Sequence, residues 1–575
     1  MRHPLRATIA AIACIACTAS GAVSDDPPVA ASVAADPGPL APAGYPTPDS
    51  TAARLQELAK LAPGKASLAQ IAVSRNGVPI HAIVLGNHDF TRRLPAMLVV
   101  AGMDGVNLGS TEQCIVAIET ALRDQPALLD TVRIYAIPEA NPDARAAAIA
   151  TGAPCATNAR AVDDDRDGRA DEDAPSDLSG DGFVGTVWRI APPGTRATHI
   201  VDPVDARIVR PANREKGELP TVEILREAID RDNDGLHGED STGGVDLDRN
   251  FPHRWPEFEA DAGPFPLSEP ETIGIARFVL DHPDIVTAVV FGRHDTLANF
   301  PDTKDKDSTG RTPVMYLAED HGLYRGLGGA WRESTKLERS ANADAAGSLF
   351  LWLANHRGIA AVAANGWARP ELPKPPEGAP EPPKTGDEEQ AAWLRVANEL
   401  SKDGFAPWKT WTHPAWGECR TGGFKPFFRE SPTIVQARDM GVRSAAFLKK
   451  LAERAPRIEV SEVSTTPLAD GLARVELRVS NTGTLATVTE MGRITDVVPP
   501  LVVRLVDRAT GQTLAPASVL QGQPVSKIDR LEQAASVEYT WTVRMPAGGL
   551  DVAVSGPTFD AILRSANAAA AKEAR

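Results

Sequence analysis

Short apolar runs alternate with helical patterns between residues 51 and 451, and this alternation restricts the fold more than any other feature. Residues 97–100, 132–137, 285–291 and 359–364 are almost entirely apolar, with Arg133 and Thr287 as exceptions, which is typical of strands buried on both faces. Residues 111–122, 271–280 and 349–355 have the periodicity of helices. The pattern predicts an α/β domain at 51–455, with a mixed sheet covered by helices on both faces.

Two segments interrupt this domain, and a second pattern follows it. An acidic insertion is expected at 163–240 and a proline-rich extended loop at 370–385. From residue 456 onward, apolar residues such as Val475, Leu477 and Val479 alternate with polar ones. Short alternating strands with turn residues between them predict a C-terminal β-sandwich domain at 456–575.

The first residues have the layout of an export signal. Arg2 and Arg6 precede an apolar run at 7–19, and small residues fill positions 20–24. A signal peptide at 1–24 and an Ala/Pro-rich tether at 25–50 are therefore expected. They predict an exported protein, periplasmic or extracellular, in which one disulfide, Cys155 to Cys419, is a candidate.

Charge and hydropathy restrict the partners. The chain of 575 residues carries 60 basic and 76 acidic side chains, a formal charge of -16. This excess opposes binding to nucleic acid, which needs a basic face. No run after the signal reaches the roughly 20 apolar residues of a membrane span, so no transmembrane segment is expected there.

Two motifs carry a specific resemblance. Residues 243–252 read Gly-Gly-Val-Asp-Leu-Asp-Arg-Asn-Phe-Pro, and residues 266–272 read Pro-Leu-Ser-Glu-Pro-Glu-Thr. The chain resembles the zinc carboxypeptidase (carboxypeptidase A-like) family, in which the two segments read Gly-Val-Asp-Leu-Asn-Arg-Asn-Phe and Ser-Glu-Pro-Glu-Thr. The resemblance implies a carboxypeptidase-like fold over roughly 51–451 and a peptide or peptide-like ligand.

The same resemblance places the family's catalytic residues on substituted positions. The His-x-x-Glu pair of zinc ligands falls on Asp104 and Asn107, and the third ligand on Gly292, with His294 as the competing candidate. The general base falls on Asn365, an amide that accepts no proton near neutral pH. Zinc is therefore doubtful, although Asp104 and Asn107 remain open to two readings: a weak oxygen site for calcium or magnesium, or simple turn residues.

The pocket for the substrate carboxylate is altered as well. The Asn-Arg pair that grips a peptide C-terminus in the family falls on Asp248 and Arg249. A carboxylate beside the guanidinium is expected to compete for it and to repel an incoming anion.

The acidic insertion contains loops with the rhythm of calcium sites. Alternate carboxylates followed by glycine are typical of loops that wrap a hard cation, whereas the competing interpretation is solvated acidic loops without metal. The candidate ligands are Asp163, Asp165, Asp167, Asp171, Asp173, Asp177, Asp181, Asp230, Asp232, Asp234 and Asp240.

These substitutions favour a degenerate family member, a pseudoenzyme that binds peptides or acts as a scaffold. The alternative is a working metallocarboxypeptidase whose ligands come from His294, Asp295, Asp104 and a neighbour such as Asp248. Family resemblance favours the enzyme, and the substituted residues argue against it.

Overall fold

The computed structural model describes residues 40–86, 91–163, 168–171, 173, 175–228, 230–231, 243–373 and 383–566. The proposed signal peptide and most of the proposed tether lie outside these residues. The described part of the chain contains no helix long and apolar enough to cross a membrane.

A mixed sheet forms the core of the α/β domain. Six of the described strands are joined in the order β1-β2-β4-β3-β9-β10. The pairs β4/β3, β3/β9 and β9/β10 are parallel, whereas β1/β2 and β2/β4 are antiparallel. The strands are β1 (Ala66–Val73), β2 (Pro79–Leu85), β3 (Ala96–Val100), β4 (Arg133–Ile137), β9 (Ile285–Phe291) and β10 (Ala360–Ala364). Every residue of β3, β4 and β10 is buried, as predicted for apolar strands.

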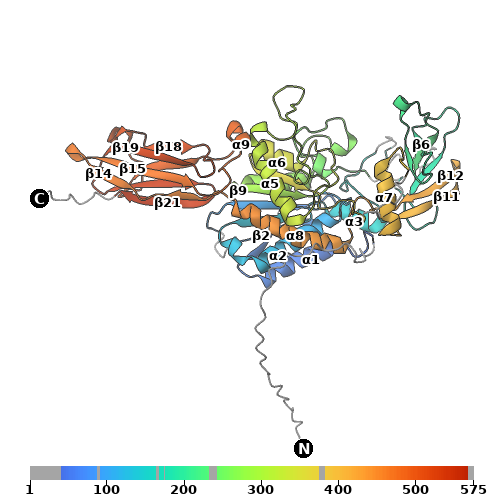
Figure 1. Ribbon diagram of the computed structural model, residues 1–575. Coiled ribbons are helices and arrows are strands. Elements are labelled where there is room, and N and C mark those ends of the chain that lie inside the picture. Colours follow the sequence, from blue (N-terminus) through green and yellow to red (C-terminus); the bar gives the residue numbers. More distant parts are fainter. Residues whose placement is uncertain are drawn as a thin grey trace, which may run out of the picture. The chain divides into compact units, whose positions relative to one another are not determined.

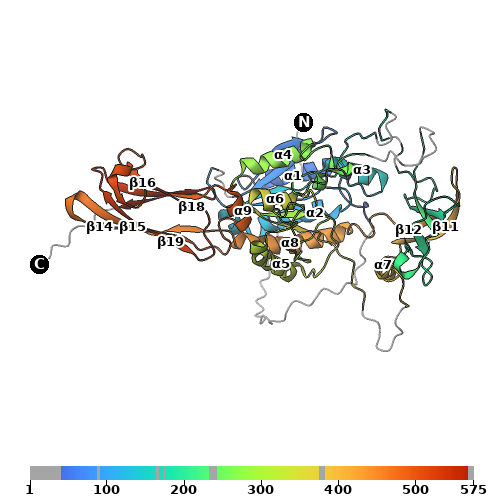
Figure 2. The same cartoon turned by 90° about the horizontal axis from the view of Figure 1, so that it is seen from above.

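Helices cover both faces of this sheet. Figure 2 shows α1 and α4 on one side and α5 and α8 on the other. Helix α2 begins in the loop after β3 and packs along α8. The helices are α1 (Pro48–Leu61), α2 (Gly109–Asp124), α3 (Pro142–Thr151), α4 (Pro270–Asp281), α5 (His321–Thr335), α6 (Leu349–Arg357) and α8 (Ile434–Glu453). The predicted fold class is therefore confirmed.

The acidic insertion contains strands that the sequence did not predict. Six described strands form a second sheet in the order β11-β12-β5-β8-β6-β7. They are β5 (Thr186–Ile190), β6 (His199–Val201), β7 (Val209–Pro211), β8 (Val222–Arg226), β11 (Phe405–His413) and β12 (Gly417–Phe424), and α7 (Glu388–Glu399) precedes β11. Segments separated by about two hundred residues thus share one sheet.

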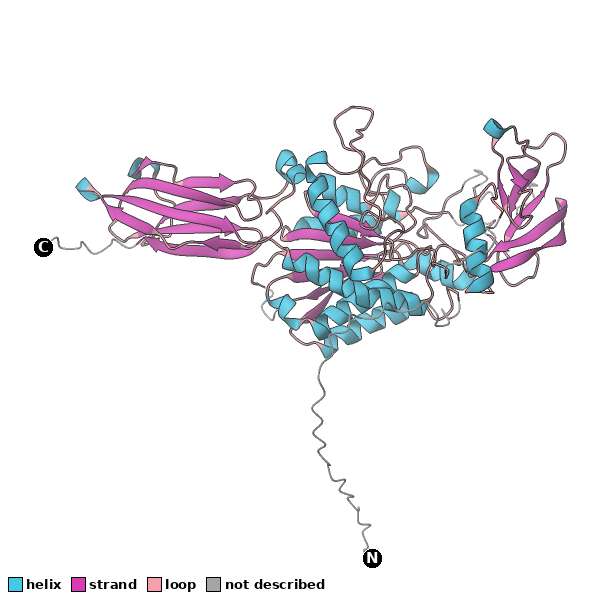
Figure 3. Ribbon diagram, in the orientation of Figure 1, coloured by secondary structure: helices cyan, strands magenta, loops and turns pink. Residues whose placement is uncertain are grey.

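The C-terminal part consists mainly of antiparallel strands, drawn in magenta in Figure 3. The described strands form sheets ordered β13-β15-β19-β17, with β14 beside β15, and β18-β16-β20-β21. They are β13 (Ile458–Val460), β14 (Ser464–Pro467), β15 (Leu472–Asn481), β16 (Leu501–Asp507), β17 (Val519–Gln521), β18 (Val525–Ile528), β19 (Ser536–Arg544), β20 (Leu550–Gly556) and β21 (Phe559–Ala566). Val475, Leu477 and Val479 share a hydrophobic core with residues of both sheets, consistent with the predicted β-sandwich.

Helix α9 (Glu490–Thr495), labelled in Figure 1, lies between β15 and β16 in the sequence and packs against α6 of the α/β domain. The Asp320 carboxylate accepts the backbone N–H groups of Glu490 and Met491 at 2.8 and 3.0 Å, and Thr489 donates to the Gly358 carbonyl at 3.1 Å. The free amides at the start of α9 are thus satisfied by the α/β domain.

A buried histidine predicts acid sensitivity of the α/β domain. His253 is fully buried, with Nε2 3.1 Å from the Pro313 carbonyl and Nδ1 3.3 Å from Nε2 of His356. Burial, and then the neighbouring His356, lowers the pKa of His253 to about 4. As pH falls, the unfolded chain takes up this proton first, so stability decreases between pH values of about 6.5 and 4, by about 3 kcal/mol.

Denaturant unfolding at neutral and acidic pH measures this loss. A His253→Gln variant, which has no imidazole to protonate, should lose less stability over the same interval. Equal losses in the two proteins would contradict the assignment.

Candidate functional site

The first part of the candidate site is the loop that follows β3. Asp104 lies in this loop, is buried, and accepts the backbone N–H groups of Val106 and Asn107 at 2.7 and 2.9 Å through one carboxylate oxygen. An aspartate that bonds the backbone two and three residues ahead stabilises a tight turn. The turn places the Asn107 side chain toward the ends of β9 and β10.

The carboxyl ends of β9 and β10 complete the site. These strands are parallel and in register, with Ala364 opposite Phe291, so Gly292 and Asn365 emerge at the same edge of the sheet. The Asn107 amide donates to the Gly292 carbonyl at 3.2 Å and to the Asn365 side-chain oxygen at 3.1 Å. The structure therefore brings together Asp104, Asn107, Gly292 and Asn365, the four positions to which the resemblance assigns the zinc ligands and the general base.

Arg293, which sequence reasoning overlooked, is the central cation of this site. Its Nε donates to Asp104 Oδ2 at 2.8 Å, and its Nη2 donates to Asp246. The two carboxylate side chains are 3% and 1% exposed, whereas the Arg293 side chain is 21% exposed, so the guanidinium covers them from solvent. Burial opposes its charge, but the Asp246 and Asp104 carboxylates outweigh this effect and raise the pKa of Arg293.

The competing candidate, His294, lies beside this cluster and faces another aspartate. Its Nε2 is 3.2 Å from Asp248 Oδ2, and its Nδ1 is 3.3 Å from the Ala343 carbonyl. The other Asp248 oxygen accepts the Leu349 backbone N–H at 2.8 Å. His294 and Asp248 are both buried, and His294 Nε2 has no hydrogen-bond partner among the described residues.

This arrangement corrects the expectation that Asp248 competes for Arg249. The Arg249 guanidinium instead faces three other carboxylates: Asp261 at 3.1 Å, Asp344 at 3.8 Å, and Glu259. The exposed fractions of these side chains are 44% for Asp261, 60% for Asp344 and 61% for Glu259. The expected pairing of Asp248 with Arg249 is wrong because adjacent residues in the short helix Leu247–Arg249 point to different sides.

The donor atoms of this site do not suit zinc. Zinc in hydrolases is held by imidazole, thiolate or carboxylate ligands, with one position left for water. Here Asp104 and Asp246 already hold a guanidinium, Asn107 offers an amide, and Gly292 offers no side chain. Within the described ranges, no three His, Cys, Asp or Glu side chains are grouped as metal ligands.

The acidic insertion is described only in part, since Asp165, Asp167, Asp232, Asp234 and Asp240 lie outside the described residues. Asp163 accepts the Gly168 N–H at 3.1 Å, and Asp171 accepts the Gly243 N–H at 2.6 Å. Asp177 accepts N–H groups from residues 180–182, and Asp181 accepts the Phe183 N–H at 3.4 Å. Asp230 lies next to the segment that is not described.

Among the described residues of the insertion, Asp173 is a buried carboxylate with an oxygen that lacks a hydrogen-bond partner. Its side chain is fully buried, and one oxygen accepts the Arg231 N–H at 2.8 Å. The other oxygen has no hydrogen-bond partner among the described residues. A buried carboxylate oxygen without a donor is costly, which favours a cation beside it.

The cysteines correct a second expectation. Cys114, Cys155 and Cys419 are free in the described part of the chain, so the candidate disulfide is not formed. Cys155 lies near the turn of Asp104, where its backbone pairs with Gly105, whereas Cys419 is buried in β12 of the second sheet.

Sequence comparison finds a family model for part of the α/β domain. Residues 51–170 match the family model described as Zinc carboxypeptidase. The resemblance inferred from the motifs is therefore confirmed for this segment, which includes Asp104 and Asn107. Residues 457–565 match a model described as Domain of unknown function (DUF8731). No curated protein matches the chain.

Solved structures of carboxypeptidases resemble the carboxypeptidase-like domain at low identity. Thrombin activatable fibrinolysis inhibitor is 13% identical, with a TM-score of 0.33, over 56% of this chain and 66% of its own. Carboxypeptidase A from Helicoverpa armigera is 15% identical, with a TM-score of 0.34, over 56% and 65%. A metallo-carboxypeptidase from Pseudomonas aeruginosa is 12% identical, with a TM-score of 0.29, over 70% and 68%. The chain thus spans slightly less than two thirds of the first two structures.

Proposed function

We propose that the protein is a catalytically degenerate relative of the zinc carboxypeptidases that binds peptides or acts as a scaffold. The observation that carries the proposal is the Arg293 guanidinium, which lies between Asp104 and Asp246. A cation that is part of the chain satisfies these buried carboxylates, so a metal ion would have to displace it.

The position of the general base supports the same proposal. The Asn365 side-chain nitrogen donates to the Ala341 carbonyl at 3.1 Å, and its oxygen accepts from Asn107. Both ends of the amide are thus engaged, and an amide cannot remove a proton from water near neutral pH. At the positions that the resemblance assigns, the described residues therefore offer neither a standard set of zinc ligands nor a general base.

The alternative, a working metallocarboxypeptidase with unusual ligands, finds less support. Its candidate ligand His294 faces Asp248, and Asp104 faces Arg293. Asp295 accepts the N–H groups of Leu297, Ala298 and Asn299 at 2.8–3.1 Å. Asp104 and Asp295 would have to give up these partners before either could bind a metal, whereas His294 Nε2 has no hydrogen-bond partner among the described residues.

An activity assay decides between the two functions. Free-acid peptides are incubated with the full chain and added zinc, and with an Asp104→Ala variant as the matched control. The proposal predicts equal, background rates of release of the C-terminal residue. A rate that depends on both zinc and Asp104 would establish the enzyme.

Calorimetry then separates peptide binding from scaffolding. One peptide is titrated in its free-acid and amidated forms. Because three carboxylates surround Arg249, the two forms should bind with similar affinity if peptides bind at all. The absence of heat with every peptide tested would favour the scaffold.

We further propose export, on the basis of the charged, apolar and small-residue layout of residues 1–24. Mass spectrometry of the protein recovered from the periplasm or medium tests this directly. A mature chain that begins after this segment supports export, and an intact N-terminus in the cytoplasmic fraction contradicts it.

Calcium is the cofactor that we propose for the acidic insertion, supported by the unpaired oxygen of Asp173. Because native loops bind the ion and the unfolded chain does not, calcium at about 100 times its dissociation constant should add about 3 kcal/mol of stability. Melting curves with calcium and with chelator measure the effect.

An Asp173→Asn variant should abolish most of the calcium effect, whereas Asp560→Asn, on the exposed part of β21, should retain it. If chelation leaves melting of the wild-type protein unchanged, the loops are acidic without metal.

A further inference from the structure

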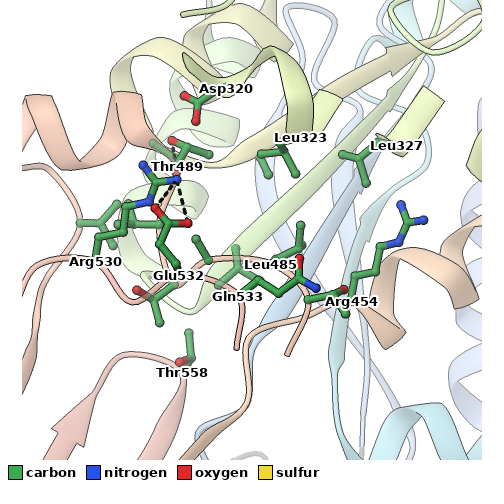
Figure 4. A pocket seen from close by; sticks show the side chains of 18 of the residues that line it. Asp320, Leu323, Leu327, Arg454, Leu485, Thr489, Arg530, Glu532, Gln533 and Thr558 are labelled. Carbon is green, nitrogen blue, oxygen red and sulfur yellow. Dashed lines mark hydrogen bonds and ion pairs between the residues drawn. The ribbon is translucent and has the colours of Figure 1, made fainter. Parts of the chain in front are cut away.

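A cavity of about 540 Å³ lies at the end of the main sheet opposite the candidate site. Its lining includes Ile285, the first residue of β9, whereas Gly292 follows the last residue of that strand. Helix α5 forms one wall, and loops at 484–489 and 530–533 of the C-terminal part form the other (Figure 4). Its volume is typical of small-molecule sites.

Backbone contacts hold the two walls together. The Leu485 N–H donates to the Arg454 carbonyl at 2.8 Å, next to the bonds that Asp320 and Thr489 make. A Cβ on Gly358 would lie only 2.5 Å from the Cα of Gly492, so the backbones of these two segments are in direct contact. The cavity therefore belongs to a close-packed joint.

Two glycines on α5 place no side chains on this wall of the cavity. Gly322 and Gly326 line the cavity, and a Cβ on either would meet no atom of the described residues within 4 Å. Glycine inside a helix costs about 1 kcal/mol relative to alanine, and here no close packing requires it. Leu323 and Leu327 lie beside them and make this wall apolar.

Two arginines that line the cavity have N–H groups without acceptors among the described residues. The Arg454 side chain makes one hydrogen bond among the described residues, from Nη1 to the Gly326 carbonyl at 3.2 Å. Arg530 pairs with Glu532 at 3.0 Å and with Glu490, yet its buried Nε has no acceptor in the described part of the chain.

The acids that line the cavity are Glu319, Asp320 and Glu532. Both Asp320 oxygens accept N–H groups of α9, and Glu532 pairs with Arg530, whereas Glu319 has an exposed side chain. In Figure 4, Arg454 and Gln533 lie apart from the Arg530–Glu532 pair. The end of the cavity near Arg454 therefore offers donors to an acceptor group.

We propose that this cavity binds a small amphipathic carboxylate. The apolar part of this ligand lies against α5 at Gly322 and Gly326, which have no side chains. The carboxylate of the ligand accepts N–H groups of Arg454. A carboxylate suits a guanidinium with unused donors, and the apolar wall excludes a fully hydrated ion.

Calorimetry with octanoate on the full chain tests the proposal, with octanol and octylammonium as comparison probes. Octanoate should bind at one site, and octanol at least about tenfold more weakly, because a hydrogen bond to a charged group is lost. An Arg454→Gln variant should weaken octanoate and leave octanol unchanged.

A matched pair of helix variants locates the binding. Gly326→Leu fills the cavity, whereas Gly329→Leu adds the same side chain to an exposed position of the same helix that does not line it. Both replace a helical glycine, so both should melt no lower than wild type. Octanoate affinity should fall at least about tenfold in Gly326→Leu and stay within about twofold in Gly329→Leu. The absence of octanoate binding, equal binding of octanol, or unchanged binding in Gly326→Leu would overturn the proposal.

Discussion

An Arg293→Ala variant is expected to lose about 3–5 kcal/mol of unfolding free energy, because it leaves the carboxylates of Asp104 and Asp246 buried without their shared cation. Urea unfolding of the variant and the wild type measures the difference. The loss should shrink at acidic pH, since a protonated carboxyl group carries no charge to bury.

Two further variants give this result its meaning. Arg293→Lys keeps a positive charge but not the planar two-sided donor, and should lose less stability than the alanine variant. Arg339→Ala removes an arginine that pairs with Glu371 at the surface and should cost little. A loss of similar size for Arg293 and Arg339 would show that Arg293 does not neutralise the buried pair.

Reversion of the site should restore tight zinc binding. The variant Asp104→His, Asn107→Glu, Gly292→His and Arg293→Ser returns the family's ligands and removes the competing cation. A Cβ on Gly292 meets no described atom within 4 Å, so an imidazole has room to begin there. We expect one zinc per chain, with an apparent binding free energy on the order of 10 kcal/mol, measured by elemental analysis and competition titration.

The matched control keeps Arg293 and makes the other three substitutions. Its guanidinium remains beside the new ligands and repels a divalent cation, so zinc should bind far more weakly. Equal zinc affinity in both variants would mean that Arg293 does not close the site. No zinc in either would mean that the ligand positions have diverged in more than side chains.

The strands β3, β4, β9 and β10 of the main sheet could be predicted because they are mostly apolar and the helices near them are periodic. The strands β1 and β2 were not predicted. The strands β3, β9 and β10 follow from runs at 97–100, 285–291 and 359–364 with errors of about one residue. The second sheet could not, because β6 and β7 have three residues each and β12 pairs with β5 from more than two hundred residues away. Short strands whose partners are distant leave little periodicity to detect.

The candidate site could be predicted only in part. Anchored motifs led to Asp104, Asn107, Gly292 and Asn365, which the structure brings together. Arg293 was overlooked because a basic residue after a strand is unremarkable until the carboxylates that face it are known. One signal in the sequence could have indicated Arg293. It follows Gly292, where a ligand is missing, and Asp104 and Asp246 lie in the segments that the resemblance places at the same site.

The zinc content of the wild-type protein shows whether Arg293 keeps metal out of the site. The full chain is purified from zinc-supplemented medium without chelator, dialysed, and analysed for metal beside the Asp104→Ala variant. We predict zinc well below one equivalent in both proteins, because Arg293 occupies the carboxylates that a metal would need. One equivalent of zinc in the wild type that is lost in Asp104→Ala would show that a metal, and not Arg293, occupies these carboxylates.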